Sequence, residues 1–160
     1  MEFKIPKKSP DAVKIIPNVW VGNHLAAKDE FFFSKEKIQS VLNMSPNIPN
    51  NFPITTEYMR IYVYDSKKNR NTFLMKTYFP VITEYIYKTC VIENKNLLVN
   101  CWLGKQRSTT AVAAYLIKFY NMNPNEAINY ILERKPDAFH NGQSVNFIDS
   151  LNDWYNLQKI

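Results

Sequence analysis

The sequence predicts an α/β domain in which a central, mainly parallel or mixed sheet of about four to five strands is flanked by helices. Short apolar runs rich in β-branched residues alternate with longer segments whose apolar residues recur at helical spacing, and helical segments dominate from Ser108 onward. The 160 residues, 46% of them hydrophobic, suffice for one compact core and contain no internal repeat. This alternation favours helices packed on a single sheet.

Four segments have the composition and length of strands. Residues 15–22 show an alternating apolar pattern, and residues 38–45 form a β-branched run that stops where proline and asparagine become frequent. Residues 59–65 end at Asp65, where a polar loop begins, and residues 96–100 form a short apolar run. This last strand leads directly into the loop that carries the chemistry.

Helical spacing of apolar residues predicts the remaining elements. Pro80 is expected to kink the first long helix or to lie near its start, because proline cannot continue the hydrogen-bond ladder. Asn123 and Glu126 have the spacing of a capping box, with proline between them in the first turn. The expected helical segments are residues 24–34 (helical or looped), 72–90, 108–122, 123–135 and 144–157.

Composition and the N-terminal residues restrict the compartment. Two cysteines are too few for a disulfide framework, which favours a reducing, intracellular environment. No apolar run reaches the roughly 18 residues that could span a bilayer, and the charged residues 1–14 do not resemble a secretory signal. We therefore expect an intracellular, cytoplasmic protein, with the nucleus also open, in which residues 1–14 form an extension and residues 15–160 the folded domain.

Charge restricts the class of partner. The formal net charge is +6, which favours acidic or phosphorylated partners over neutral ones. The basic residues are scattered, and no block of five or six like charges appears, so the sequence does not favour nucleic acid. His24 and His140 have no companions at ligand spacing, and we expect neither a metal nor a cofactor.

The segment VNCWLGKQRSTT, residues 99–110, joins a predicted strand to a predicted helix. The backbone N–H groups of residues 102–107 lack intrahelical partners there and can converge on one anion, favoured by the helix dipole. Gly104 permits a tight bend, and Arg107 can clamp two phosphoryl oxygens. The same field favours the thiolate of Cys101, the nucleophilic form.

A cysteine, five residues, an arginine and a serine between a strand and a helix resemble the signature loop of the Cys-based protein tyrosine phosphatases, and the small dual-specificity branch fits best. IIPNVWVGNHLAAKD, SVLNMS and YVYDS resemble that family's opening strand, central strand and general-acid loop. The resemblance covers the chain except residues 1–14. It implies a protein tyrosine phosphatase-like fold.

The resemblance also implies a role for each residue of the site. Cys101 attacks phosphorus and forms a cysteinyl-phosphate, while Arg107 and the backbone of Trp102, Leu103, Gly104, Lys105 and Gln106 hold the phosphate oxygens. Ser108 hydrogen-bonds the sulfur and eases departure of the thiolate. Asp65, 36 residues before the cysteine, is the general acid, although it could instead cap a turn or the following helix.

Two departures from the family pattern affect these expectations. Asn100 stands where the family has histidine; it can still hold the loop by hydrogen bonds but carries no positive charge, which predicts slower chemistry. In HNGQSVNF, residues 140–147, Ser144 and Asn146 replace the family's Asn-x-Gly-Phe run, and we expect little catalytic consequence.

Five other side chains have two possible interpretations each. Trp102 and Leu103 either shape the pocket mouth or pack on a neighbouring strand. Gln106 is expected, like Lys105, to face solvent or substrate. Cys90 is expected to be a buried helix cysteine rather than a disulfide partner of the nucleophile.

The sequence thus predicts a dual-specificity protein phosphatase that hydrolyses phosphotyrosine and phosphoserine or phosphothreonine in phosphorylated protein substrates. One alternative is a catalytically weak pseudophosphatase that only binds phosphoproteins. Another is the same chemistry on an RNA 5′ phosphate or a phosphoinositide. The chain is expected to be a monomer or a homodimer.

Overall fold

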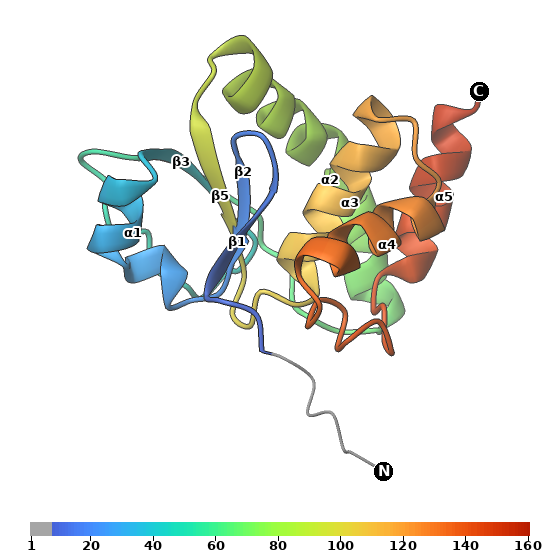
Figure 1. Ribbon diagram of the computed structural model, residues 1–160. Helices are drawn as coiled ribbons and strands as arrows, with labels where there is room; N and C mark the ends of the chain where they lie inside the picture. Colours follow the sequence, from blue (N-terminus) through green and yellow to red (C-terminus); the bar gives the residue numbers. More distant parts are fainter. Residues whose placement is uncertain (1–7) are drawn as a thin grey trace.

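The computed structural model describes residues 8–160, and its centre is a five-stranded sheet (Figure 1). The strand order is β1-β2-β5-β3-β4; β1 and β2 are antiparallel, and all other neighbours are parallel. The predicted mixed α/β sheet is therefore confirmed. The strands are β1 (Ala12–Ile16), β2 (Val19–Gly22), β3 (Ile38–Asn43), β4 (Glu57–Arg60) and β5 (Asn96–Asn100).

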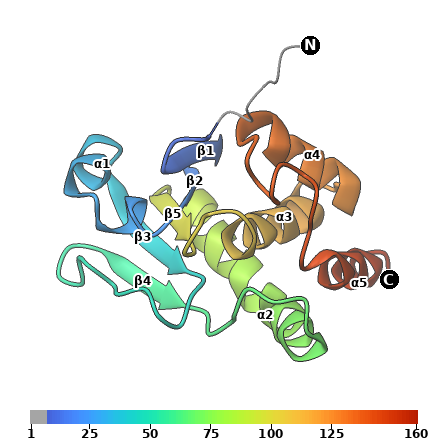
Figure 2. The same ribbon diagram turned by 90° about the horizontal axis from the view of Figure 1, so that it is seen from below.

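Helices cover the two faces of the sheet unequally (Figures 1 and 2). The short helix α1 packs on β3 and the 3-10 turn η1 packs on β5, whereas the longer helices form a layer on the other face, with α3 in contact with β2 and β5. The bounds are η1 (Ala26–Lys28), α1 (Glu30–Lys35), α2 (Asn69–Tyr87), α3 (Arg107–Phe119), α4 (Pro124–Arg134) and α5 (Ile148–Gln158), with a π-helical turn η2 (Lys88–Ile92) after α2.

Local sequence explains the helix boundaries only in part. At the start of α4 the Asn123 side chain accepts a hydrogen bond from the Glu126 N–H, and the Glu126 carboxylate accepts one from the Asn123 N–H, so the predicted capping box is present. Pro80 lies inside α2, not at its start. In α3 every residue from Arg107 to Ile117 is buried, because this helix lies between the sheet and the outer helices.

Three predicted elements differ from the structure. Residues 15–22 form no single strand: Asn18 adopts a left-handed φ of 70°, and the chain folds into the β1–β2 hairpin. The strand expected over residues 59–65 corresponds to β4, which already ends at Arg60. In residues 61–65 only Ile61 and Val63 are buried. The last helix begins at Ile148, four residues after the expected start.

Parallel pairing brings the carboxyl ends of three strands to the same edge of the sheet. Gly22 of β2 and Asn43 of β3 are both in register with Asn100 of β5. The segments that follow these strands therefore meet at one place, as expected where parallel strands end. In Figure 1 this is the lower edge of the sheet, and Figure 2 looks onto it from below.

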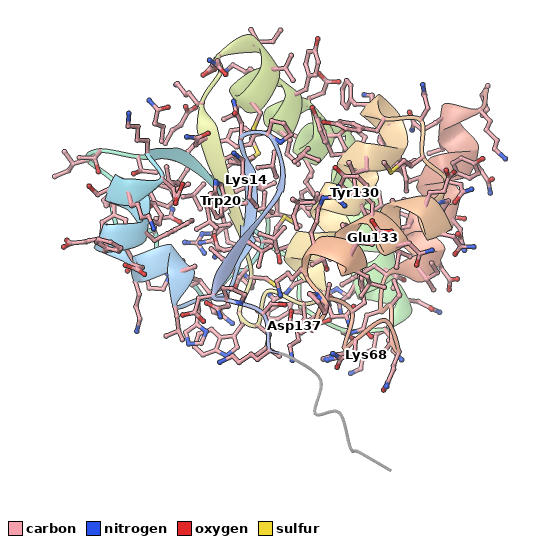
Figure 3. All side chains as sticks on the ribbon, viewed as in Figure 1. Lys14, Trp20, Lys68, Tyr130, Glu133 and Asp137 are labelled. Atoms are coloured by element: carbon pink, nitrogen blue, oxygen red, sulfur yellow. The ribbon has the colours of Figure 1, made fainter. Side chains whose placement is uncertain are left out.

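The described N-terminal residues are attached to the helical layer near the same edge. The Ser9 N–H donates to Asp137 Oδ2 at 3.3 Å, and Lys135 Nζ donates to Asp137 Oδ1 at 2.6 Å. Figure 3 labels Asp137 beside the point where the N-terminal segment reaches the domain. Of the extension expected over residues 1–14, residues 1–7 lie outside the described residues, and the sheet begins at Ala12. Within residues 8–160, no helix combines the length and apolarity needed to cross a membrane.

Candidate active site

The loop of residues 102–106 connects β5 to α3 and presents a set of backbone donors. Within residues 8–160, none of the N–H groups of residues 102–106 donates a hydrogen bond to the protein. Gln106 is the N-cap residue of α3, but its side chain accepts no hydrogen bond from the first turn of the helix. The N–H groups of that turn therefore have no capping side chain. The loop can therefore offer several N–H groups to one anion at a helix N-terminus.

Gly104 lets this loop approach the sheet closely. Its φ is +70°, and a Cβ built on it would lie 3.0 Å from the carbonyl carbon and oxygen of Gly22 and 3.1 Å from the Asn23 nitrogen. These are backbone atoms at the end of β2 and cannot rotate away. Glycine is thus required here both for backbone conformation and for space.

Cys101 and Ser108 lie on opposite sides of the loop and face each other. The Cys101 residue is 2% exposed, and its Sγ is 3.2 Å from Ser108 Oγ. Ser108 is in the first turn of α3 and is fully buried. The predicted contact between the serine hydroxyl and the sulfur is therefore present in the structure, and the hydroxyl can donate to a thiolate.

Arg107 is held beneath the loop and connects it to the segment that carries Asp65. Its guanidinium is buried, with the residue 8% exposed, and Nη1 donates to the Val63 carbonyl oxygen at 3.1 Å. Its Nε has no hydrogen-bond partner within residues 8–160. A buried guanidinium with an unused donor can bind a further anionic group.

Asp65 lies exposed at the rim of the same site. Its Oδ1 accepts a 2.7 Å hydrogen bond from Asn146 Nδ2. Sequence reasoning missed this contact, because the two residues are 81 positions apart and Asn146 belongs to a segment expected to have little catalytic consequence. The structure places the Asn146 amide beside the Asp65 carboxyl group.

The segment before α5 also holds the loop of residues 102–106 through the Gln106 side chain. Gln106 Nε2 donates to the Ser144 carbonyl oxygen at 2.7 Å, and Gln106 Oε1 accepts from the Asn146 N–H at 3.1 Å. Gln106 is 1% exposed, so of the two expectations for its side chain, contact with solvent is wrong, whereas Gln106 does belong to the lining of the pocket. Since the nitrogen and the oxygen of its side-chain amide are both hydrogen-bonded to residues 144–146, Gln106 fixes the loop against that segment.

A pocket of about 360 Å³ gathers the predicted residues on its walls. Cys101 and Arg107 line it together with Asp65, and Trp102 and Leu103, each half exposed, form part of its rim. Of the two readings for Trp102 and Leu103, the structure therefore supports the pocket mouth. The remaining lining residues are Ser45, Asn47, Tyr64 and Gln106.

Asn100, next to the site, differs from expectation, whereas Cys90, far from it, confirms expectation. The Asn100 side chain is fully buried, and neither of its polar atoms has a partner within residues 8–160, so it does not hold the loop by side-chain hydrogen bonds. Cys90 is buried as expected, and its Sγ donates to the Asn18 carbonyl in the β1–β2 turn, at the end of the sheet opposite to Cys101. Burial raises the pKa of the Cys90 thiol to about 12.

Residues 8–160 bring together no group of three or more His, Cys, Asp or Glu side chains suited to a metal ion. The site consists instead of a sulfur, a guanidinium, a carboxyl group and backbone N–H groups around one pocket. This set can bind a tetrahedral dianion, attack it with sulfur and supply a proton to a departing oxygen.

Comparison with known proteins gives consistent matches over most of the chain. A family model described as "Dual specificity phosphatase, catalytic domain" matches residues 19–157. Tyrosine-protein phosphatase vhp-1 from Caenorhabditis elegans is 30% identical over 145 residues, 89% of this chain and 21% of that protein. Dual specificity protein phosphatase 15 from mouse is 27% identical over 147 residues, 92% of this chain and 60% of that protein.

A solved structure gives the same fold. The crystal structure of human DUSP28 superimposes with a TM-score of 0.82 at 19% identity, covering 95% of this chain and 97% of that one. The chain thus spans nearly all of this structural neighbour but less than two thirds of either sequence relative described above.

Proposed function

The chain belongs to the dual specificity phosphatase catalytic-domain family, and from this premise we propose that it hydrolyses phosphotyrosine and phosphoserine or phosphothreonine in proteins through a cysteinyl-phosphate intermediate. The observation that carries the proposal is the shared pocket. Cys101 and Arg107, which flank one loop, and Asp65, which comes from a distant segment, line one cavity together with residues of that loop, whose N–H groups have no acceptor within residues 8–160. Nucleophile, anion clamp and proton donor are then within reach of a single phosphate.

In the first step the Cys101 thiolate attacks phosphorus, and the bond between phosphorus and the leaving oxygen breaks. The backbone N–H groups of residues 102–106 and the Arg107 guanidinium hold the equatorial oxygens, whose charge they stabilise in the transition state. The Asp65 carboxyl group gives its proton to the leaving oxygen, so that the product departs as a neutral hydroxyl.

In the second step a water molecule attacks the phosphocysteine. The Asp65 carboxylate, now unprotonated, accepts a proton from that water, and the phosphorus–sulfur bond breaks to release inorganic phosphate. The Ser108 hydroxyl, 3.2 Å from the sulfur, donates to the departing thiolate. A hydrogen bond to a charged acceptor contributes about 1.5 to 3 kcal/mol, so Ser108→Ala is expected to slow this step by about one to two orders of magnitude.

The decisive experiment measures phosphate release from a phosphotyrosine peptide without added metal. Cys101→Ser should abolish release. Asp65→Asn should reduce kcat by about two to four orders of magnitude on this substrate but far less on p-nitrophenyl phosphate, whose leaving group is stable as an anion. Asp153→Asn is the matched control, because Asp153 is an exposed carboxylate whose ion pair within residues 8–160 is with Lys76 on the surface, and activity should be unchanged.

Other outcomes identify the alternatives. If the wild type releases no phosphate but binds the phosphopeptide through Arg107, the chain is a phosphoprotein-binding module. A phosphoserine peptide, a 5′-phosphorylated RNA and a phosphoinositide measured beside the phosphotyrosine peptide identify the substrate class. Equal loss on both leaving groups in Asp65→Asn would contradict the acid role.

A further inference from the structure

His24, in the corner between β2 and η1, makes three contacts with one residue of the phosphate-facing loop. Its backbone N–H donates to the Trp102 carbonyl oxygen at 3.0 Å, and its Nδ1 is 2.9 Å from the same oxygen. The imidazole also stacks on the Trp102 indole, with ring centroids 3.9 Å apart and planes inclined by 2°. The proposed reaction steps make no use of His24.

The Trp102 carbonyl must point away from the pocket that contains Cys101. His24 is absent from the lining of that pocket and lines a separate hollow of about 220 Å³, which Trp102 and Leu103 also line. The loop therefore separates two hollows, and the carbonyl oxygen faces the one on the His24 side.

Because the peptide bond is planar, the contact between His24 and the Trp102 carbonyl also fixes the direction of the Leu103 N–H. In a trans peptide the C=O of one residue and the N–H of the next point in opposite directions. No cis peptide occurs within residues 8–160, so fixing the Trp102 carbonyl toward His24 directs the Leu103 N–H toward the Cys101 side. That N–H has no acceptor within the described part of the protein.

We propose that His24 is a positioning residue for the phosphatase reaction: it locks the Trp102–Leu103 peptide so that the Leu103 N–H faces the phosphate, and it holds the Trp102 indole as a fixed wall of the pocket. This inference rests on the proposed function and deepens it. If the peptide rotated, a carbonyl oxygen would face the phosphate in place of a donor, which would repel the dianion. Loss of a single oxyanion donor costs about 10²- to 10³-fold in rate.

The carbonyl determines the state of the imidazole. Because Trp102 O is only an acceptor, His24 Nδ1 must carry a proton, and both the Nδ1–H neutral tautomer and the imidazolium satisfy this. The hydrogen bond to Trp102 O and the stacking on the indole are therefore available to either form of the imidazole. Two backbone contacts, Cys101 N to Gly22 O at 3.3 Å and Gly104 against Gly22, support the same corner, so loss of the ring should loosen the loop without unfolding it.

Two substitutions separate the hydrogen bond from the stacking. His24→Asn places an amide nitrogen near the position of Nδ1 and removes the ring, whereas His24→Phe keeps a ring against Trp102 and removes the donor. His140→Asn, which removes the other histidine of the chain, is the control. Each variant is measured for binding of inorganic phosphate by calorimetry, for kcat and KM on the phosphotyrosine peptide, and for thermal unfolding.

We expect His24→Phe to lose about tenfold to a hundredfold in both phosphate affinity and kcat, less than a full donor deletion because the His24 backbone bond remains. His24→Asn should recover most of this loss, and the midpoints of thermal unfolding should stay close together. The proposal is overturned if His24→Phe binds phosphate as the wild type does, if His24→Asn falls equally far, or if the wild type binds no phosphate. Phosphate binding without peptide hydrolysis would refute the proposed function while still testing His24.

Discussion

Gly104→Ala is predicted to disable the phosphate-binding loop while the domain remains folded. A non-glycine residue at φ +70° costs about 1 to 2 kcal/mol. The added Cβ would also lie 3.0 Å from the Gly22 carbonyl atoms, where ordinary carbon contacts are about 3.5 to 4.0 Å, so the loop must withdraw by about 0.5 to 1 Å. A displacement of this size in a catalytic array costs on the order of 100-fold in rate.

Gly142→Ala is the matched control for backbone conformation. Gly142 has a φ of +77°, but its Cβ would meet only side-chain atoms of Leu132, at 3.1 Å for the nearest, and these can move. Both variants should lower the midpoint of thermal unfolding by a few degrees, while only Gly104→Ala should lose kcat/KM on the phosphotyrosine peptide and affinity for phosphate. Equal activity of the two variants would refute the account of a loop fitted against β2.

Three further outcomes follow from contacts around the site. Asn146→Ala frees the Asp65 carboxyl group and should lower kcat about tenfold on the phosphotyrosine peptide but little on p-nitrophenyl phosphate; an equal loss on both would place Asn146 elsewhere in the reaction. Brief treatment with iodoacetamide should modify Cys101 and spare Cys90, whose pKa is raised to about 12 by burial, and peptide mass spectrometry would detect a contrary pattern. Burial opposes ionisation of Asp137, but hydrogen bonds from Lys135 and Ser9 outweigh burial and lower the pKa of this carboxyl group. The carboxylate therefore stabilises the fold above about pH 4, and this stabilisation is lost as the pH falls further. Asp137→Asn should therefore unfold in less urea at neutral pH and depend less on pH in the acid range, whereas an unchanged acid limb would show that another group dominates.

The sequence predicted the centre of the site because its signals are local. The strand that ends at Asn100, the loop and the helix that begins at Arg107 are adjacent in the chain, and glycine, cysteine and arginine each have a physical reason for their place in it. The family resemblance stated on these residues is confirmed by the match over residues 19–157. The mixed sheet was predictable for a similar reason, since most of its strands coincide with short apolar runs, although β1 and β2 were read as one strand.

The supports of the loop could not be predicted, because they come from distant positions. His24 lies 78 residues from Trp102, and Asn146 lies 81 residues from Asp65; each is a polar residue in a loop, with no pattern that distinguishes it from a solvated one. The β1–β2 hairpin was read as one strand because alternation of apolar residues continues through its turn. The turn consists of Pro17 and Asn18 alone, and the left-handed Asn18 tolerates its conformation without a glycine signal.

The buried polar side-chain atoms that lack a partner lie close to the site. Within residues 8–160, every buried side-chain nitrogen or oxygen without a partner belongs to the carboxyl ends of β3 and β5 or to the first turn of α3, in Asn43, Asn100, Arg107 and Thr110. Each such group costs about 1 to 3 kcal/mol, and a chain selected for stability alone would not concentrate them under one loop. Arg107 lines the pocket, so a bound phosphate can accept a hydrogen bond from its Nε. The free energy lost by burying this unpaired donor is then recovered when phosphate binds. Asn100 does not line the pocket and gains nothing from the ligand in this way, which makes it the position where the departure from the family pattern carries a cost without a visible return.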